Sequence, residues 1–367
     1  MLIKYWLAKQ LRTPQWIRKH RSTLMMILGL VAFIIYLTFF VGIQSLLQLL
    51  SQLNLKQYTL YYSIAIAALF LSVIFDSLIW HSLLDGLKVK LSLKKVIMFN
   101  WIGNFVEMVI PCETVCGEVT RIYLSKKETK ENFGVTAAPI ITSRILSTFV
   151  YTGGLLIGSL ILVTTQKMPL YLAGTLLLVA GGSIGIIGLV LFLALKDSTA
   201  DKLVSVVMTL VRVVTKNTVK QEQQKEKLRL LLYSFSEAFR TYKKYPRFLV
   251  KPMIYAVTAW FFTLLVYLMV FYSLDFTTIS LVDLALVYFV SSTVETITAG
   301  FPVGAVEITM ISLYSALGVP IIVAGAATTL TRLLTFWFQI IAGYSIFQMT
   351  GLRKLLKGGV SQNLLEE

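Results

Sequence analysis

The chain has 367 residues, of which 56% are hydrophobic and 14% are charged, and it carries 34 Lys and Arg against 18 Asp and Glu. Soluble domains contain about 25% charged residues, so this composition excludes an ordinary soluble protein and predicts an all-α polytopic membrane protein. A net charge of +16 can indicate a nucleic-acid partner, but its meaning depends on where the basic residues lie relative to the apolar spans. We expect one integral membrane domain over residues 1–367, with no nucleic-acid partner.

The first segment, residues 1–23, is basic and precedes an apolar run over residues 24–43. A secretory signal has a shorter apolar core of about 7 to 15 residues, followed by a small-residue cleavage site. Neither feature is visible here. The run at 24–43 is therefore predicted to be a retained first transmembrane span.

Further along the chain, five apolar runs reach the roughly 20 residues that a helix needs to cross a bilayer. They are residues 58–80, 136–164, 170–195, 251–273 and 321–348. Two other apolar stretches, 96–124 and 281–317, are interrupted by Pro, Gly and Glu. Irregular backbone at membrane depth is tolerated where it lines a cavity. We therefore predict six full transmembrane helices plus two re-entrant helical hairpins.

Loop charge orients these elements. Basic side chains gather in five segments, which hold 30 of the 34 Lys and Arg: residues 1–23, 81–95, 119–135, 196–251 and 349–367. By the positive-inside rule these segments are cytoplasmic, which places both termini in the cytoplasm of a cell-membrane protein. A full crossing at either interrupted stretch would put a basic block on the wrong face.

The long segment at residues 197–246 has apolar residues at helical spacing, with Lys and Arg on the other faces. Basic amphipathic helices of this kind lie in the membrane interface and favour anionic headgroups. The alternative is that these helices pack against the cytoplasmic ends of the spans. The sequence leaves both interpretations open.

The two interrupted stretches repeat one arrangement of charge. The first copy, residues 58–164, contains in order Glu107, Pro111, Gly117, Glu118 and, 26 residues later, Arg144. The second copy, residues 251–348, contains Glu295, Pro302, Gly304, Glu307 and, 25 residues later, Arg332. By loop charge the two hairpins open from opposite faces, so we predict an inverted repeat, which in secondary transporters builds a midplane binding site. The prolines and glycines are expected to shape the hairpins.

These motifs resemble those of a known family. The residues involved are Pro111, Gly117, Glu118 and Arg121 in one motif, Phe301, Pro302, Gly304 and Glu307 in another, and the paired Arg144 and Arg332. Together they are similar to the membrane domain of lysylphosphatidylglycerol synthases and of related stand-alone flippase-like proteins, over about residues 20–350. The resemblance implies movement of a lipid between leaflets. About 19 residues follow the last predicted span, so we expect no synthase domain.

Seven residues are predicted to bind substrate or couple its transport: Glu107, Glu118, Arg121, Arg144, Glu295, Glu307 and Arg332. Arginine suits a phosphate because its planar fork donates two parallel hydrogen bonds, and a glutamate in a membrane can carry a proton. An isolated charge at mid-membrane costs roughly 2.5 to 3.5 kcal/mol, so these residues should pair. Pairing that only fixes the hairpins is the alternative explanation.

Three functions follow from these residues. The first is a flippase or translocase of a phospholipid or polyprenyl-phosphate-type lipid, with anionic membrane lipids as partners. The second is a proton- or ion-coupled transporter of a small soluble anion, and the third is a membrane enzyme acting on a lipid-linked substrate. Because no nucleophile with an adjacent base is evident, we expect no enzyme activity. A homo-oligomer is compatible with all three.

The remaining candidate residues suggest no further chemistry. Cys112 and Cys116 lack the histidine neighbours of a zinc site, so we expect no metal and no cofactor, and we interpret both as small residues at a hairpin tip. Asp76 and Asp283 fall near the predicted ends of a span and a hairpin. They are expected to be interfacial.

Overall fold

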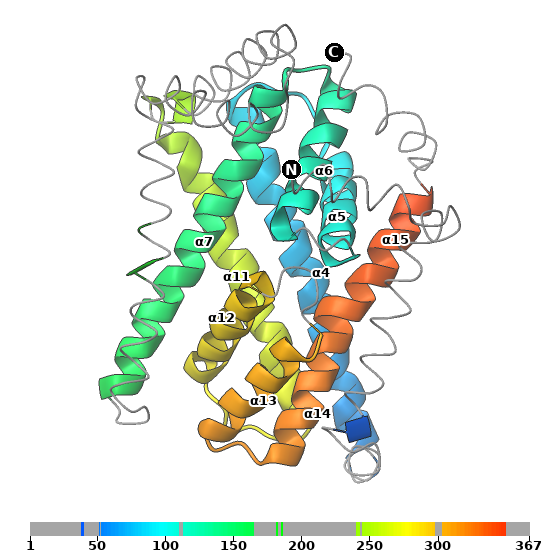
Figure 1. Cartoon of the computed structure of the whole chain (residues 1–367), viewed down its shortest axis with the longest axis vertical. Coiled ribbons are helices and arrows are strands. Elements are labelled where there is room, and N and C mark those ends of the chain that lie inside the picture. Colours follow the sequence, from blue (N-terminus) through cyan, green and yellow to red (C-terminus); the bar gives the residue numbers. More distant parts are fainter. Residues whose placement is uncertain are drawn as a thin grey trace, which may run out of the picture.

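The computed structural model describes residues 38–39, 51, 53–109, 113–164, 181–182, 185, 240–242, 244–297 and 303–349. Within these ranges the ordered elements are helices (Figure 1). Four stretches are long and apolar enough to cross a membrane: Leu55–Gly86, Phe133–Gly158, Arg247–Ser273 and Ile321–Met349. The expected all-helical membrane architecture is thus confirmed at four of the six predicted spans. The predicted spans at 24–43 and 170–195 lie outside the described residues, as do segment 1–23 and most of 197–246.

The first long helix begins at a side-chain cap. Helix α4 (Leu55–Gly86) starts after Asn54, whose side chain accepts hydrogen bonds from the backbone N–H groups of Lys56 and Gln57. A side chain in this position satisfies donors that the first helical turn leaves without partners. Helix α7 (Phe133–Thr164) and helix α11 (Arg247–Ser273) are the other long helices, and α4 and α11 run beside each other (Figure 1).

Two pairs of short helices lie between the long ones. Helices α5 (Leu93–Val109) and α6 (Glu113–Thr129) form the first pair, and α12 (Leu281–Ile297) and α13 (Ala305–Ala316) form the second. At 1.5 Å per residue, none of the four reaches the roughly 30 Å of a bilayer core. Figure 1 shows the first pair in the upper part of the molecule and the second pair in the lower part. The order of long, short, short and long helices thus occurs twice, while the assignment of re-entrant hairpins stays a prediction.

The last span is interrupted. Helix α14 (Ile321–Arg332) is followed directly by a π-helix, η2 (Leu333–Phe338), and then by α15 (Gln339–Met349). A π-turn inserts an extra residue into the helical register, and such turns occur frequently at functional sites. Arg332 is the residue immediately before this turn, so the irregularity begins at a predicted site residue.

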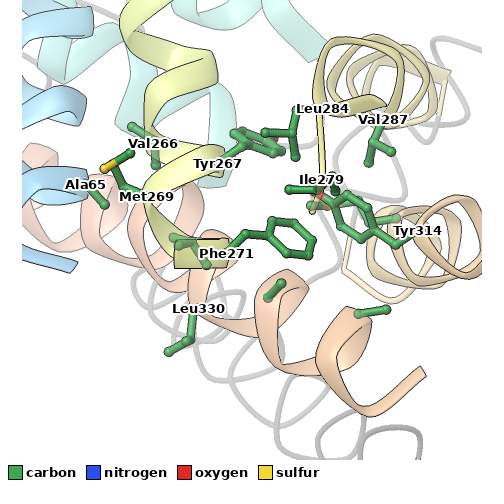
Figure 2. Close-up of a cluster of buried hydrophobic side chains, with 14 of the residues drawn as sticks. Ala65, Val266, Tyr267, Met269, Phe271, Ile279, Leu284, Val287, Tyr314 and Leu330 are labelled. Carbon is green, nitrogen blue, oxygen red and sulfur yellow. The ribbon is translucent and has the colours of Figure 1, made fainter. Parts of the chain in front are cut away.

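An apolar core holds the second helix pair against α11 and α4. Figure 2 shows part of it, with Phe271 of α11 beside Tyr314 of α13, and their ring centroids lie 4.9 Å apart in an edge-to-face arrangement. A separate cluster around Trp80, Val96 and Ile122 packs the first pair against α4. Each helix pair therefore has its own apolar support.

Helix α15 approaches the first pair closely. A Cβ atom added at Gly343 would lie 2.6 Å from the Cβ atom of Phe105 and 2.7 Å from the carbonyl oxygen of Trp101. Nearby, Asn104 donates a hydrogen bond from Nδ2 to Gln339 Oε1 at 3.1 Å. These contacts join the end of the second copy of the pattern to the first helix pair, so residues of both copies can line one space.

Candidate functional site

A cavity of about 320 Å³ lies among the helices. Every helix from α4 to α7 and from α11 to α15, together with η2, contributes to its wall. The charged residues that line it are Asp76, Glu107, Glu118, Arg121, Arg144, Glu295 and Arg332. Glu307 is fully buried directly behind this wall, in contact with Arg332. The structure therefore brings all seven sequence-predicted residues to one place.

The first cluster consists of Glu107, Glu118, Arg121 and Arg144. Arg144 donates from Nη2 to Glu107 Oε1 at 3.1 Å, and its Nε lies 3.1 Å from Glu118 Oε1. Arg121 completes the cluster, with Nη1 3.1 Å from Glu118 Oε1 and Nη2 3.7 Å from Glu107 Oε2. Two carboxylates thus share two guanidinium groups, which come from α6 and α7.

Arg121 is held more tightly than Arg144. It is buried, and its Nη2 also donates to the side-chain oxygen of Asn104 on α5. The side chain of Arg144 is 42% exposed, whereas that of Arg121 is 8% exposed. Arg121 was counted among the 30 Lys and Arg of the predicted cytoplasmic segments. Because it is buried in the cluster, it does not belong to that count.

The second cluster consists of Glu295, Glu307 and Arg332. Arg332 donates from Nη1 to Glu295 Oε1 at 3.1 Å and from Nε to Glu307 Oε1 at 2.8 Å. Its guanidinium also lies over the ring of Phe336, with 4.4 Å between the guanidinium carbon and the ring centroid. Hydrogen bonds with charged partners are stronger than neutral ones, so this buried ion pair fixes the end of α14 against α13.

Two arginine nitrogens still have donor capacity. Arg121 Nε and Arg332 Nη2 are buried and have no hydrogen-bond partner in the parts of the chain that the structure describes. A buried donor without a partner carries a desolvation penalty of about 1 to 3 kcal/mol.

Glycines shape the site at three points. A Cβ atom at Gly117 would lie 2.8 Å from both Glu107 Oε2 and the carbonyl oxygen of Gly103, and one at Gly103 would lie 2.5 Å from Arg121 Nε. Gly304 has a φ of +94°, a conformation that a side chain disfavours. Its N–H donates to Glu307 Oε2 at 2.6 Å, so this turn positions the buried glutamate.

Three predicted features need a separate statement. The hairpin-shaping Pro111 and Pro302 lie outside the described residues. Cys116, which the sequence analysis interpreted as a small residue at a hairpin tip, is disulfide-bonded. Cys112 lies outside the described residues. No group of three metal-ligating side chains occurs within the described residues.

Asp76 is a site residue that the sequence analysis missed. It was expected at the end of a span, but α4 continues to Gly86, so Asp76 lies well inside the helix and lines the cavity. Its Oδ2 accepts a hydrogen bond from Asn100 Nδ2 at 2.9 Å. The signal that could have found it was the apolar residues beyond position 80, which extend the span past its predicted end. Asp283, by contrast, accepts from the N–H and hydroxyl of Ser280 at the start of α12.

Three tyrosines of the cavity wall were also not predicted. Tyr288 contacts Tyr151 and Tyr267 in edge-to-face arrangements, with ring centroids 5.6 and 5.7 Å apart. All three line the cavity. In an apolar helix a tyrosine resembles any other core residue, so nothing in the sequence distinguished these three from the rest.

Comparison with known proteins agrees with the motifs. The sequence model of the family described as lysylphosphatidylglycerol synthase TM region matches residues 26–343. The chain belongs to this family. A UPF0104 membrane protein of Pyrococcus horikoshii is 26% identical to it over 332 residues, which cover 88% of this chain and 95% of that protein. No solved structure matches the chain.

Membership of the lysylphosphatidylglycerol synthase TM family confirms the resemblance that the motifs predicted. The matched residues include both clusters and the whole cavity wall. Together with the four candidate spans, the match identifies a multi-pass membrane protein.

Proposed function

We propose that this protein is a transporter rather than an enzyme, and that it moves a phospholipid or a polyprenyl-phosphate-type lipid across the cell membrane by alternating access. The observation that carries the proposal is a single cavity to which both arginine–carboxylate clusters contribute. Corresponding interrupted segments in two repeats are where secondary transporters bind their substrates. In this arrangement one headgroup site could face either leaflet in turn.

The chemistry of the cavity favours a phosphate. Arg144 is the most exposed arginine of the clusters, and Arg121 and Arg332 line the same cavity. Guanidinium groups bind phosphate oxygens with pairs of charge-assisted hydrogen bonds. A phosphate would have to compete with glutamates for these donors, so binding and release would rearrange the same ion pairs.

The size of the cavity favours a headgroup over a whole lipid. Ligand pockets range from about 300 to 1,000 Å³, and this cavity is at the lower end of that range. Large apolar side chains such as Phe149, Ile157 and Phe261 are exposed on the outer faces of α7 and α11. Lipid chains could remain in the bilayer against such faces while the headgroup occupies the cavity.

The test is transport in proteoliposomes that contain a headgroup-labelled phospholipid or polyprenyl phosphate, with a membrane-impermeant quencher to report the leaflet. We expect the native protein to move the labelled lipid and Arg332→Ala to abolish the movement. Lys95→Ala, which removes a charge from an exposed ion pair with Glu128, is the matched control. Uptake of small soluble anions with no lipid movement would support a transporter of small soluble anions instead. Full lipid movement by a folded Arg144→Ala/Arg332→Ala protein would refute the phosphate site.

A further inference from the structure

The carboxylates of the cavity outnumber its arginines. Four carboxylates and three guanidinium groups line the wall, and Glu307 lies buried behind it. With all of these groups ionised the site is negative, which opposes an anionic phosphate. A phosphate would bind better if one carboxylate were neutral, so the question is which carboxylate takes up a proton.

The four glutamates are all paired with arginine. Each has an arginine nitrogen within 4.0 Å: Glu107 and Glu118 contact Arg144, and Glu295 and Glu307 contact Arg332. An arginine beside a carboxylate favours its ionised form. Glu118 and Glu307, which are among the seven residues predicted to bind substrate or couple its transport, are therefore held as partners of arginine.

Asp76 differs from them in its contacts. No arginine or lysine nitrogen lies within 4.0 Å of its carboxylate among the described residues. Within the described part of the chain, its carboxylate accepts one hydrogen bond, the 2.9 Å contact from the neutral amide of Asn100, which also donates to Ser77 Oγ at 3.1 Å. This amide can donate to one oxygen of Asp76 whether or not the other oxygen carries a proton.

Asp76 lies ten residues before the end of α4 at Gly86, on the stretch of this helix that lines the cavity. Titratable and charged groups that line the cavity with it come from α5, α6, α7, α11, α12 and α14: Glu107, Glu118, Arg121, Arg144, Tyr151, Tyr267, Tyr288, Glu295 and Arg332. Arg144 and Tyr151 are close enough to interact with Asp76 electrostatically.

We propose that Asp76 is the proton-binding residue of this transporter, and that its carboxylate takes up one proton when an anionic headgroup occupies Arg144. The step is the addition of a proton to a carboxylate oxygen, and release of the headgroup reverses it. An ionised Asp76 and a phosphate repel each other in one small cavity. A bound phosphate therefore favours protonation of Asp76, and a protonated Asp76 favours binding of the phosphate. By linkage, the headgroup and the proton then bind together. This inference rests on the proposed function only for its link to lipid movement.

The first test does not depend on transport. Infrared difference spectra of the purified protein in lipid nanodiscs, recorded across a pH titration, report the carbonyl stretch of a protonated carboxyl group. We expect a titrating band in the native protein, its loss in Asp76→Asn, and its retention in Asp85→Asn. Asp85 is the matched control because it lies on the same helix, is exposed and is paired with His81. A band that persists unchanged in folded Asp76→Asn would overturn the assignment, as would no titrating band in the native protein.

The second test asks whether protonation of Asp76 is coupled to lipid movement. In proteoliposomes with an imposed pH gradient, we expect the gradient to change the rate of lipid movement in the native protein by at least about fivefold, the lower range of allosteric coupling. Asp76→Asn should move lipid at a rate that is independent of the gradient, and Asp76→Glu should recover part of the dependence. Dependence that survives in Asp76→Asn, or that follows sodium rather than pH, would overturn the inference while leaving lipid transport intact. Loss of the infrared band in a protein that moves no lipid would support the proton site and contradict the proposed function.

Discussion

In the first cluster Arg144 bridges two glutamates at 3.1 Å each, and in the second Arg332 bridges two at 3.1 and 2.8 Å. In both clusters the arginine follows the first of its glutamates by 37 residues. Their surroundings differ, because the Arg144 side chain is 42% exposed and the Arg332 side chain is 4% exposed. The arginine that bridges two glutamates is therefore partly exposed in one half of the molecule and buried in the other, while Glu295 of the second cluster is 39% exposed.

The difference in exposure separates two roles of an ion pair. A buried pair is costly to break because each charge left behind has no water to replace its partner, whereas an exposed pair is stabilised by only about 1 kcal/mol or less. The first cluster can thus exchange partners with a ligand at lower cost than the second. A transporter that alternates between two states would have one bridging arginine exposed and the other buried in each state. The exposed arginine of one state would be the buried arginine of the other.

The largest expected effect is that of Arg332→Ala. Removing this guanidinium leaves the fully buried Glu307 without its cationic partner, so we expect loss of transport and a decrease of about 3 to 5 kcal/mol in the free energy of unfolding. Denaturant unfolding in micelles measures the second quantity. Arg332→Met combined with Glu307→Gln should recover much of the stability but no transport. Equal stability losses in Arg332→Ala and Arg144→Ala would break the comparison between the clusters.

Arg144→Ala should separate function from stability. We expect transport to be lost, with a decrease in the free energy of unfolding of about 1 kcal/mol or less, because the ion pair is partly open to solvent. Arg144→Lys should retain part of the transport, since a lysine supplies the charge without the planar fork. Full transport by the alanine variant would contradict the role of Arg144 in headgroup binding.

The sequence was sufficient to predict which charged residues pair in each cluster, but not that the two bridging arginines differ in exposure. The spacing of Glu118 and Arg144, repeated in Glu307 and Arg332, was enough to predict which residues meet. Exposure depends on how each helix is rotated about its axis. In a helix such as α4, which is apolar around most of its circumference, periodicity cannot reveal that rotation. For the same reason the three tyrosines were missed, whereas Asp76 was missed because the span was ended at residue 80 and α4 continues to Gly86.

A smaller effect is expected at the glycine contact of the first pair. In Gly117→Ala the new methyl group would lie 2.8 Å from Glu107 Oε2, so α5 and α6 must separate at a cost of about 1 to 3 kcal/mol. Gly153→Ala in α7 is the control, since no atom lies within 4 Å of its added Cβ, and alanine favours a helix over glycine by up to about 1 kcal/mol. Thermal unfolding of both variants in micelles measures the difference. If Gly117→Ala is as stable as Gly153→Ala, the close packing of α5 against α6 at Gly117 is contradicted.

The smallest effect is expected from Lys95→Ala. Lys95 and Glu128 form an exposed ion pair between α5 and α6, outside the cavity. We expect a change in unfolding free energy of about 1 kcal/mol or less and unchanged transport. If transport fell as far as in Arg144→Ala, general loss of positive charge, rather than the cluster geometry, would explain both results.

The central claim is that the two clusters form one site that opens to opposite faces of the membrane. Ser143, beside Arg144, and Ser292, one turn before Glu295, both line the cavity. The measurement is the reaction of Ser143→Cys and Ser292→Cys with a membrane-impermeant thiol reagent added to either side of sealed proteoliposomes, in a transport-competent background without Cys112 and Cys116. We predict that the two positions react from opposite faces and that bound lipid slows both reactions. Reaction of both positions from one face alone would contradict alternating access at this site.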